Sequence, residues 1–450
     1  MENVERILTN VDFQGHAQTP RINLQRVLRK DLAPEFHQQV DRLGASPPLD
    51  HSTLAIAILR DAQKARVSDI HFEPRTSGTR LRFRIDGILS EVAELPISVA
   101  RIVINQFKAL SGLDPVTRFT VKDTRATVNF NGEGLDIRLA VAPCHHGEAL
   151  VVRLLDPKRL ERSLTELGLP GCALAQIEEW LEQMTGMFLC AGPTGSGKTT
   201  TCYALLHEVK FADRAIISIE DPIEYQIDGI TQIRIDEFHH VGFQEAVRSV
   251  LRLDPDFLML GEIRDAISAH SAVDAAISGR VLLSTLHCRD SAEAITALRN
   301  WGLTDHEIGE TLSVVMAQRL VRKLCPHCRR SVKPTLIDLK WLKAMNLPKP
   351  SKMSDSTGCK KCQNLGYIGR TGLFELWRLD EDDYRLLHDH ADEHTLRQNF
   401  ISKSQHVLLR DAFAKIDDGT TSLAEVRKLS GLVPLAHRGR SNSSRVSPAS

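Results

Sequence analysis

Hydrophobic and polar positions alternate in the stretch TRLRFRIDGILSEV, where Leu81, Phe83 and Ile85 are separated by arginines. A period of two predicts a half-buried strand, here with a basic outer face. The stretches SDIHFEP, LDIRLAVAP and EALVVRLLD predict further strands, and TLAIAILRDAQKA, which begins at Thr53, has helical periodicity. We therefore expect a small α/β domain over residues 51–155.

Four short apolar runs occur further along the chain: GMFLCAG, AIISIED, DFLMLGE and RVLLSTLH, with helical stretches between them. This alternation predicts a parallel sheet with crossover helices, which we assign to residues 169–320. The stretch DPKRLERSLTELGLPG predicts a linker over residues 156–168. Residues 1–50 are expected to form a short N-terminal extension, with helical potential in INLQRVLRKDL. The Ser- and Arg-rich residues 436–450 predict a disordered tail.

The composition of the 450-residue chain is typical of a soluble globular protein, with 42% hydrophobic and 25% charged residues. Lys plus Arg equals Asp plus Glu at 57 each, so no bulk charge directs the chain to nucleic acid or to an anionic membrane. The N-terminus lacks the pattern of a secretory signal, and no stretch approaches the roughly 18–20 apolar residues that span a bilayer. We expect a cytoplasmic protein that meets the membrane only through partners.

The stretch AGPTGSGKTTTCYALL contains the phosphate-loop pattern G-x-x-x-x-G-K-[ST], between an apolar strand and a helix. Glycines let backbone N–H groups converge on a phosphate, and the start of the helix adds a favourable dipole. Lys198 is expected to reach the β- and γ-phosphate oxygens of ATP, and Thr199 to hold Mg²⁺. The alternative is a chance glycine-rich turn. The predicted nucleotide-binding residues are Gly192, Pro193, Thr194, Gly195, Ser196, Gly197, Lys198, Thr199 and Thr200.

Acidic side chains follow the next two apolar runs, and hydrolysis needs a group that positions water. Glu220 ends one predicted strand and Glu262 follows another, while Gly261 occupies the usual place of a magnesium-side carboxylate. Glu262 is therefore the candidate water-orienting or metal-side acid, and Glu220 the candidate second acid. His287 follows a further strand, where it can sense the γ-phosphate. The alternatives are strand-end carboxylates that cap helices and a histidine packed against a backbone group.

Two CxxC pairs form the second chemical signature. They supply Cys325, Cys328, Cys359 and Cys362. This spacing predicts a tetrahedral Zn²⁺ site, structural because four cysteines leave no open position. Paired disulfides and a redox dithiol are the alternatives, which a reducing cytosol disfavours. We assign residues 321–370 to a tetracysteine zinc subdomain and residues 371–435 to a C-terminal helical part.

Six blocks occur in order: GPTGSGKTTT, IEDPIEYQIDGI, LRLDPDFLMLGEIRD, STLH, AQRLVRKLCPHC and GYIGRTGLFEL. Together with SDIHFEP and LRFRIDGIL upstream, they resemble the secretion ATPases of the type II secretion and type IV pilus assembly family. The resemblance covers about residues 50 to 430. It implies a RecA-like P-loop ATPase domain, a smaller PAS-like α/β N-terminal domain and a zinc-bearing C-terminal subdomain.

The same resemblance implies a function and partners. Members of the family are homo-hexamers on the cytoplasmic side of the bacterial inner membrane, where ATP hydrolysis drives pilin or pseudopilin subunits into a growing fibre. The implied partners are a polytopic inner-membrane platform protein and an adaptor of the same machine.

Roles for single residues also come from the resemblance. Glu262 matches the catalytic glutamate of the family, and His287 its histidine box. Arg138 and Arg153 match arginines that meet the γ-phosphate in relatives, which suits transition-state stabilisation when the domains close. The segments VKDTR and HGEA depart from the family's PQDGR and HGER.

Two other functions compete with a fibre-assembly motor. A nucleic-acid translocase on a RecA-like core predicts a basic pore stripe and DNA-stimulated turnover. The neutral charge balance and the cysteine pairs disfavour it, so no nucleic acid is expected as a partner. A structural adaptor that binds ATP without turnover is disfavoured by the intact Lys198, Thr199 and Glu262.

Overall fold

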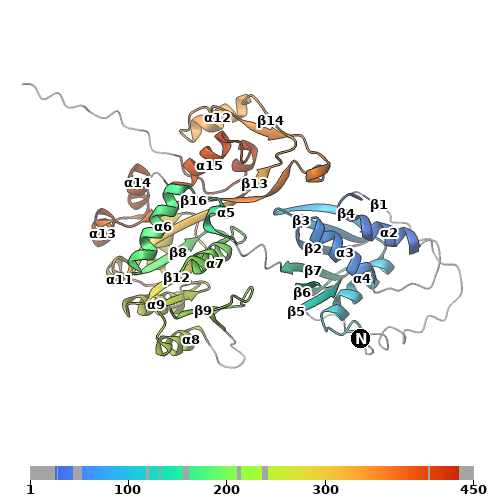
Figure 1. The fold of residues 1–450 in the computed structure, drawn as a ribbon, viewed down its shortest axis with the longest axis horizontal. Helices are drawn as coiled ribbons and strands as arrows, with labels where there is room; N and C mark the ends of the chain where they lie inside the picture. Colours follow the sequence, from blue (N-terminus) through green and yellow to red (C-terminus); the bar gives the residue numbers. More distant parts are fainter. Residues whose placement is uncertain are drawn as a thin grey trace, which may run out of the picture. The chain divides into compact units, whose positions relative to one another are not determined.

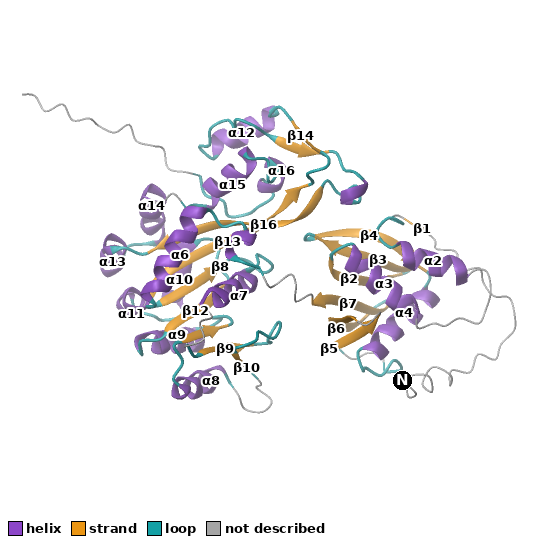
Figure 2. Ribbon diagram, in the orientation of Figure 1, coloured by secondary structure: helices purple, strands orange, loops and turns teal. Residues whose placement is uncertain are grey.

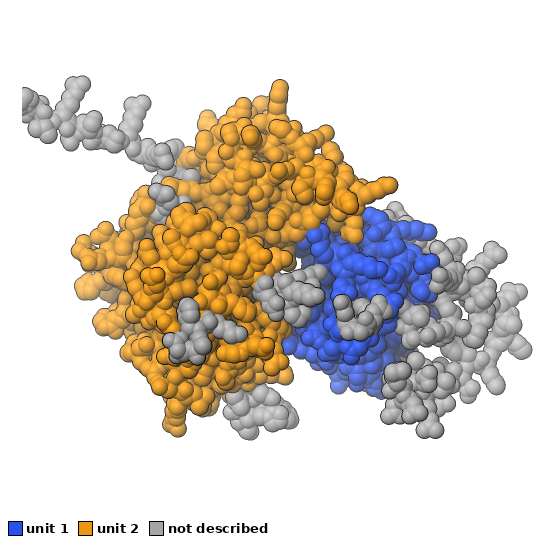
Figure 3. All heavy atoms as spheres, in the orientation of Figure 1, with its two compact units in different colours: residues 1–157 blue, residues 158–450 orange. Residues whose placement is uncertain are grey.

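The computed structural model describes residues 26–27, 29–43, 53–117, 121–130, 133–155, 162–209, 214–235, 242–403 and 406–434. Figure 1 labels their helices and strands, and Figure 2 separates the two by colour. The chain divides into two compact units, residues 1–157 and 158–450 (Figure 3). No helix within the described ranges is long and apolar enough to cross a membrane. The predicted tail lies outside the described residues.

The first unit is built on one antiparallel sheet with the strand order β1-β4-β3-β2-β7-β6-β5. Its strands are β1 (Arg26–Val27), β2 (Val67–Arg75), β3 (Gly78–Ile85), β4 (Ile88–Leu95), β5 (Lys122–Phe130), β6 (Glu133–Cys144) and β7 (Gly147–Leu155). Its helices are α2 (Pro34–Leu43), α3 (Thr53–Lys64) and α4 (Ile97–Leu110). Strands are confirmed within all four sequence stretches, and so is the helix predicted at Thr53. The stretch TRLRFRIDGILSEV, predicted as one strand, is instead a hairpin: β3 ends at Ile85 and β4 begins at Ile88. The turn between them is Asp86–Gly87, with φ of 48° and 88°, a pair of residues that suits a tight hairpin turn.

The alternating stretch behaves as its period predicts. Leu81 and Phe83 on β3 are fully buried, while Arg82 between them is partly exposed. On the buried side, the ring of Phe72 (β2) packs against that of Phe107 (α4), with centroids 5.6 Å apart. On the outer side, Arg80 pairs with Glu73 of β2 at 2.8 Å, so neighbouring carboxylates offset part of the basic face.

The helix expected within INLQRVLRKDL is wrong for the residues that the structure describes there. Arg26–Val27 form the short strand β1, paired with β4, and the helix α2 begins later, at Pro34. Proline suits the first turn of a helix because the N–H that it lacks has no intrahelical partner there. The Asp61 carboxylate accepts the backbone N–H of Phe36 at 2.8 Å, which ties α2 to α3.

The second unit is a sheet with the order β10-β9-β11-β12-β8-β13-β16, parallel except for β16. Its strands are β8 (Met187–Ala191), β9 (Ile216–Glu220), β10 (Thr231–Arg234), β11 (Phe257–Leu260), β12 (Val281–Leu286), β13 (Leu312–Leu324) and β16 (Tyr367–Arg378). The predicted parallel sheet is confirmed for the four apolar runs, which are β8, β9, β11 and β12. The pattern did not identify β13 and β16, which widen the sheet.

Helices cover both faces of this sheet (Figure 2). They are α5 (Leu164–Leu167), α6 (Gly171–Gln183), α7 (Lys198–Val209), α8 (Phe243–Val250), α9 (Ala266–Ile277), α10 (Ser291–Asn300), α11 (Asp305–Thr311), α13 (Glu381–His388), α14 (Glu393–Lys403), α15 (Leu408–Asp417) and α16 (Leu423–Val426), with the 3-10 turn η3 (Leu251–Leu253). In β8, Phe188 and Cys190 join the core under α5–α7, while Leu189 and Ala191 join the core on the other face. Burial on both faces explains the continuous apolar runs.

The cysteine-bearing segment lies between the antiparallel strands β13 and β16. It contains the helix α12 (Leu336–Ala344), the 3-10 turn η4 (Lys360–Cys362) and a small ribbon of β14 (Arg329–Ser331) and β15 (Ser354–Ser356). In Figure 1 this segment lies beyond the sheet, at one end of the long β13–β16 pair. The stretch expected to be helical from residue 371 therefore begins as the strand β16 and becomes helical at α13.

A buried ion pair connects the C-terminal helices to the start of the second unit. The Asp411 carboxylate on α15 accepts the backbone N–H of Phe374 at 2.8 Å and the ammonium of Lys415 at 2.6 Å. Lys415 also donates to the carbonyl oxygen of Gly168, just after α5, at 2.8 Å. Asp411 and Lys415 are both buried, so each charge depends on the other.

We predict that Asp411→Ala lowers the free energy of unfolding by about 3–5 kcal/mol, because Lys415 would remain buried without its counter-charge. Glu381→Ala is the control, since that carboxylate is 90% exposed and its pair with Arg385 spans 3.4 Å. The control should change stability by less than about 1 kcal/mol. Urea denaturation followed by circular dichroism measures both, and equal losses would contradict the prediction.

Candidate ATP-hydrolysis site and metal centre

The phosphate loop joins β8 to α7 at the carboxyl edge of the sheet. Gly195 and Gly197 have φ of 77° and 93°, a region that only glycine adopts without strain. A Cβ on Gly192 would lie 2.4 Å from Ser196 Oγ and 2.8 Å from the carbonyl oxygen of Gln318. The helix begins at Lys198, so the N–H groups of its first turn have no intrahelical acceptors and are free to bind an anion. This cradle fits a phosphate.

Lys198 is buried at the base of this loop. Its ammonium donates to the carbonyl oxygens of Gly192 at 2.8 Å and Pro193 at 3.4 Å, and lies 3.5 Å from His287 Nδ1. Burial lowers the pKa of this ammonium, and the nearby charge of Glu262 partly opposes the shift. The two carbonyl acceptors are neutral, so they do not cancel the positive charge of Lys198. Phosphate oxygens bound at the loop would neutralise it.

Glu262 and His287 meet from the ends of neighbouring strands, β11 and β12. The distance from His287 Nε2 to Glu262 Oε1 is 2.7 Å, and Arg264 Nε donates to the other carboxylate oxygen at 3.1 Å. Because the Lys198 ammonium can only donate, Nδ1 of the histidine accepts, and Nε2–H then donates to Glu262. Three predicted residues, Lys198, His287 and Glu262, therefore form one continuous chain of contacts.

Glu220 lies apart from that chain. It is buried at the end of β9, and its carboxylate accepts hydrogen bonds from Tyr203, from Ser218 Oγ at 2.6 Å and from Gln232 Nε2 at 3.1 Å. Burial, followed by the charge of Glu220, raises the pKa of the Tyr203 hydroxyl. These contacts join α7, β9 and β10 behind the phosphate loop.

Gly261 explains why no carboxylate occupies the usual magnesium-side position. A Cβ at this residue would lie 3.3 Å from the carbonyl oxygen of Ile219 and 3.4 Å from the Cα of Glu220. A side chain at this position would therefore be in tight contact with the backbone of β9, and the nearest strand-end acid on β11 is Glu262.

Arg138 and Arg153 lie in the first unit, directly opposite each other on β6 and β7. Arg138 donates to both carboxylate oxygens of Asp123, at 2.6–3.1 Å, and Arg153 Nε donates to Asp69 at 2.9 Å. Both guanidinium groups are partly exposed, on the strands that the alternation predicts.

The four predicted cysteine ligands form one cluster, with all sulfur atoms within 4.8 Å of one another. The Sγ–Sγ distances are 3.8 Å for Cys325–Cys359, 3.9 Å for Cys328–Cys362 and 3.7 Å for Cys359–Cys362. Zn–S bonds of about 2.3 Å in a tetrahedron require sulfurs about 3.8 Å apart, whereas a disulfide requires about 2.05 Å.

Backbone donors contact one sulfur of this cluster. The N–H groups of Cys359 and Gly366 donate to Cys362 Sγ at 3.1 and 3.2 Å. The pKa of Cys359 is lowered to about 7, mainly by hydrogen bonding to the backbone at Cys362. Burial raises the pKa of Cys328 to about 12, so the two cysteines differ. Four sulfurs at tetrahedral spacing fit a Zn²⁺ ion.

Sequence reasoning gave no role to two side chains that contact this site. Arg264 binds Glu262 and also lies 3.4 Å from Asp221, and Gln318 on β13 donates to the carbonyl oxygen of Ser196 at 2.8 Å. Gln318 lies within the block AQRLVRKLCPHC, which was identified as a motif without a mechanism.

A parallel sheet that places a phosphate loop, a strand-end glutamate and a histidine at one edge defines a RecA-like P-loop nucleoside triphosphatase. The chain matches the family described as "Type II/IV secretion system protein" over residues 50–428. The chain therefore belongs to this family of secretion ATPases, and the predicted fold class, family and ATPase activity are confirmed.

Two curated relatives illustrate the likeness. The chain is 36% identical over 400 residues to the type II secretion system ATPase E of Vibrio cholerae. This alignment covers 88% of this chain and 79% of that protein. The chain is also 36% identical over 403 residues to the type IV pilus assembly ATPase PilB of Myxococcus xanthus, covering 88% and 71% of the two chains.

Solved structures support the fold alone, since their sequence identities are low. The ATPase DotB of Legionella pneumophila superposes with a TM-score of 0.62 at 20% identity, over 85% of this chain and 96% of that one. The pilus retraction motor PilT superposes with a TM-score of 0.56 at 21% identity, over 82% and 94%.

We predict that Glu262→Gln retains nucleotide binding while ATP turnover falls by about 100-fold or more, because the amide cannot accept a proton from water. Lys198→Ala should instead abolish binding, since it removes the charge beneath the phosphates. Binding of a fluorescent ATP analogue and phosphate release separate the two effects. Equal loss of binding in both variants would contradict the roles assigned here.

We predict that Cys359→Ser releases zinc and lowers the melting temperature, because one of four ligands is lost. Cys172→Ser is the control, since Cys172 is an exposed cysteine outside the cluster. Metal analysis and thermal unfolding measure the two effects. Unchanged zinc content in Cys359→Ser would refute the four-cysteine site.

Proposed function

We propose that this chain hydrolyses Mg²⁺-ATP to power the assembly of a type IV pilus or of a type II secretion pseudopilus. The observation that carries the proposal is the Lys198–His287–Glu262 chain beside the phosphate loop. It occurs in a protein 36% identical to a secretion ATPase and 36% identical to a pilus assembly ATPase. The alternative, a nucleic-acid translocase, has no comparable support.

In the proposed reaction, the loop N–H groups and Lys198 bind the β- and γ-phosphates. Bound at the Thr199 hydroxyl, Mg²⁺ would supply positive charge to the phosphate oxygens. Glu262 orients water and accepts its proton once the contacts with His287 and Arg264 open. His287 contacts both Lys198 and Glu262, so a γ-phosphate bound at Lys198 would change the position of Glu262 through the histidine. Glu220 was predicted as a second acid. Its buried hydrogen bonds instead favour a structural role, in which it holds α7, β9 and β10 together next to the phosphate loop.

Arg138 and Arg153 are proposed as the arginines that complete the site when the two units close. Each forms an ion pair with a carboxylate of its own unit and is partly exposed, so each can exchange that carboxylate for a phosphate. A guanidinium placed on a separate unit stabilises transition-state charge only in the closed state. Hydrolysis would then be coupled to movement between the units.

The proposed working form is a homo-hexamer on the cytoplasmic face of the bacterial inner membrane. There it would act on a polytopic platform protein, together with an adaptor of the same machine. In this proposal, Zn²⁺ in the four-cysteine site is structural and holds the segment between β13 and β16.

We predict that ATP turnover by purified protein is confined to hexamers and does not respond to DNA. Size-exclusion fractions assayed for phosphate release, with and without duplex and single-stranded DNA, test this. Turnover in monomers, or stimulation by DNA together with DNA binding, would support the translocase instead. Glu262→Gln provides the background rate in every fraction.

A further inference from the structure

The strand β13 contacts the phosphate loop directly. It pairs with β8 in parallel, with Ala317 opposite Ala191, so the next residue, Gln318, lies beside the first loop residue. Gln318 is 1% exposed, and its side-chain amide donates to the carbonyl oxygen of Ser196 at 2.8 Å. Ser196 lies within the loop, so this hydrogen bond holds the loop backbone in place.

The next residue of β13, Arg319, contacts the loop that follows β12 and begins with His287. Arg319 is 5% exposed, and its guanidinium donates to the carbonyl oxygen of Arg289 at 2.6 Å and to that of Gln318 at 2.9 Å. The Arg289 carbonyl lies two residues after His287. Burial lowers the pKa of this guanidinium.

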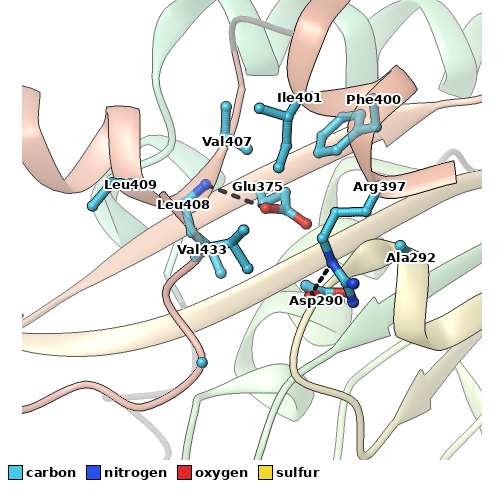
Figure 4. A pocket seen from close by; sticks show the side chains of 11 residues that line it. Asp290, Ala292, Glu375, Arg397, Phe400, Ile401, Val407, Leu408, Leu409 and Val433 are labelled. Atoms are coloured by element: carbon cyan, nitrogen blue, oxygen red, sulfur yellow. Dashed lines mark hydrogen bonds and ion pairs between the residues drawn. The ribbon is translucent and has the colours of Figure 1, made fainter. Parts of the chain in front are cut away.

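The neighbouring strand β16 binds the same loop. Glu375, opposite Ala317 in register, accepts the backbone N–H of Ser291 at 2.9 Å and that of Leu408 at 3.4 Å. Figure 4 shows its carboxylate between Leu408 and the Arg397–Asp290 pair, inside a pocket behind the loop. The loop from His287 to Ser291 is therefore held at two backbone groups by buried side chains of β13 and β16.

A buried arginine bonded to carbonyl oxygens is a costly way to gain stability. Moving a charge out of water costs several kcal/mol, and an apolar side chain of similar volume often stabilises as well or better. Both Gln318 and Arg319 instead direct their donors at the loops that carry Lys198 and His287. The arrangement suits accurate placement of these loops, for which an error of about 1 Å can cost about 100-fold in rate.

We propose that Gln318 and Arg319 are positioning residues for ATP hydrolysis, with separate tasks. Gln318 holds the phosphate loop in its nucleotide-binding shape, and Arg319 holds the His287 loop so that the histidine stays aligned with Glu262. The inference rests on the proposed roles of Lys198, His287 and Glu262.

The two tasks predict different kinetic effects. Arg319→Ala should lower kcat by about 100-fold and leave the Kd for a fluorescent ADP analogue within about threefold. Gln318→Ala should raise that Kd by about tenfold, with a smaller loss of kcat, because one buried hydrogen bond of the loop is lost. Arg319→Lys retains one donor for the Arg289 carbonyl and should recover part of kcat.

Arg322→Ala is the matched control. Arg322 lies on the same strand and pairs with Glu425 at 2.6 Å, away from both loops. It should lower the melting temperature while kcat, per folded molecule, stays within about twofold. Zinc content is measured on every variant to confirm that the four-cysteine cluster is intact.

The proposal is overturned if Arg319→Ala keeps kcat, or loses it only in proportion to the unfolded fraction, as the control would. It is equally overturned if both variants change Kd and kcat by the same factors. Absence of turnover in the wild-type hexamer would instead contradict the proposed function. The Kd shift of Gln318→Ala would then still test the role of the glutamine, because ADP binding needs no turnover.

Discussion

The parallel pairing of β8 with β12 on one side and β13 on the other is the constraint on which the site depends. β8 and β12 end at the same edge, and β13 passes that edge at Gln318. Gly192, His287 and Gln318 therefore lie together although they are far apart in sequence. Burial on both faces fixes this register, since a slip by one residue would exchange the two cores. Placement of the chemistry therefore depends on hydrophobic burial.

Buried polar side chains at this edge hold the loops in place by hydrogen bonds. Lys198, Gln318, Arg319 and Glu375 are all buried, and each directs its side chain at backbone atoms of a loop. A buried donor without an acceptor costs about 1–3 kcal/mol, so the loops and these side chains stabilise one another. The loops then keep their shape before any nucleotide arrives, which lowers the cost of binding.

Local patterns predicted much of the fold. Period two predicted β3, and continuous apolar runs predicted the four central parallel strands, because these signals report burial on one or both faces. The pattern did not identify β13 and β16, since their residues include several buried polar groups, such as Gln318 and Glu375. It also failed at β1, where pairing with the edge of β4 decided the structure of two residues.

The site residues also divide into those that a local sequence pattern predicts and those that it does not. The phosphate loop, the strand-end glutamate and the cysteine pairs are local motifs, and the structure brings Lys198, His287 and Glu262 into contact and gathers the four sulfurs. The contacts of Glu220 with Tyr203, and of Arg319 with the His287 loop, join elements distant in sequence, so no local pattern contains them. The cysteine segment connects the C-terminal end of β13 to the start of β16. At about 40 residues this segment is at the size where a core alone seldom suffices. A metal would fix one end of the β13–β16 pair, whose interior residues Gln318, Arg319 and Glu375 contact the catalytic loops.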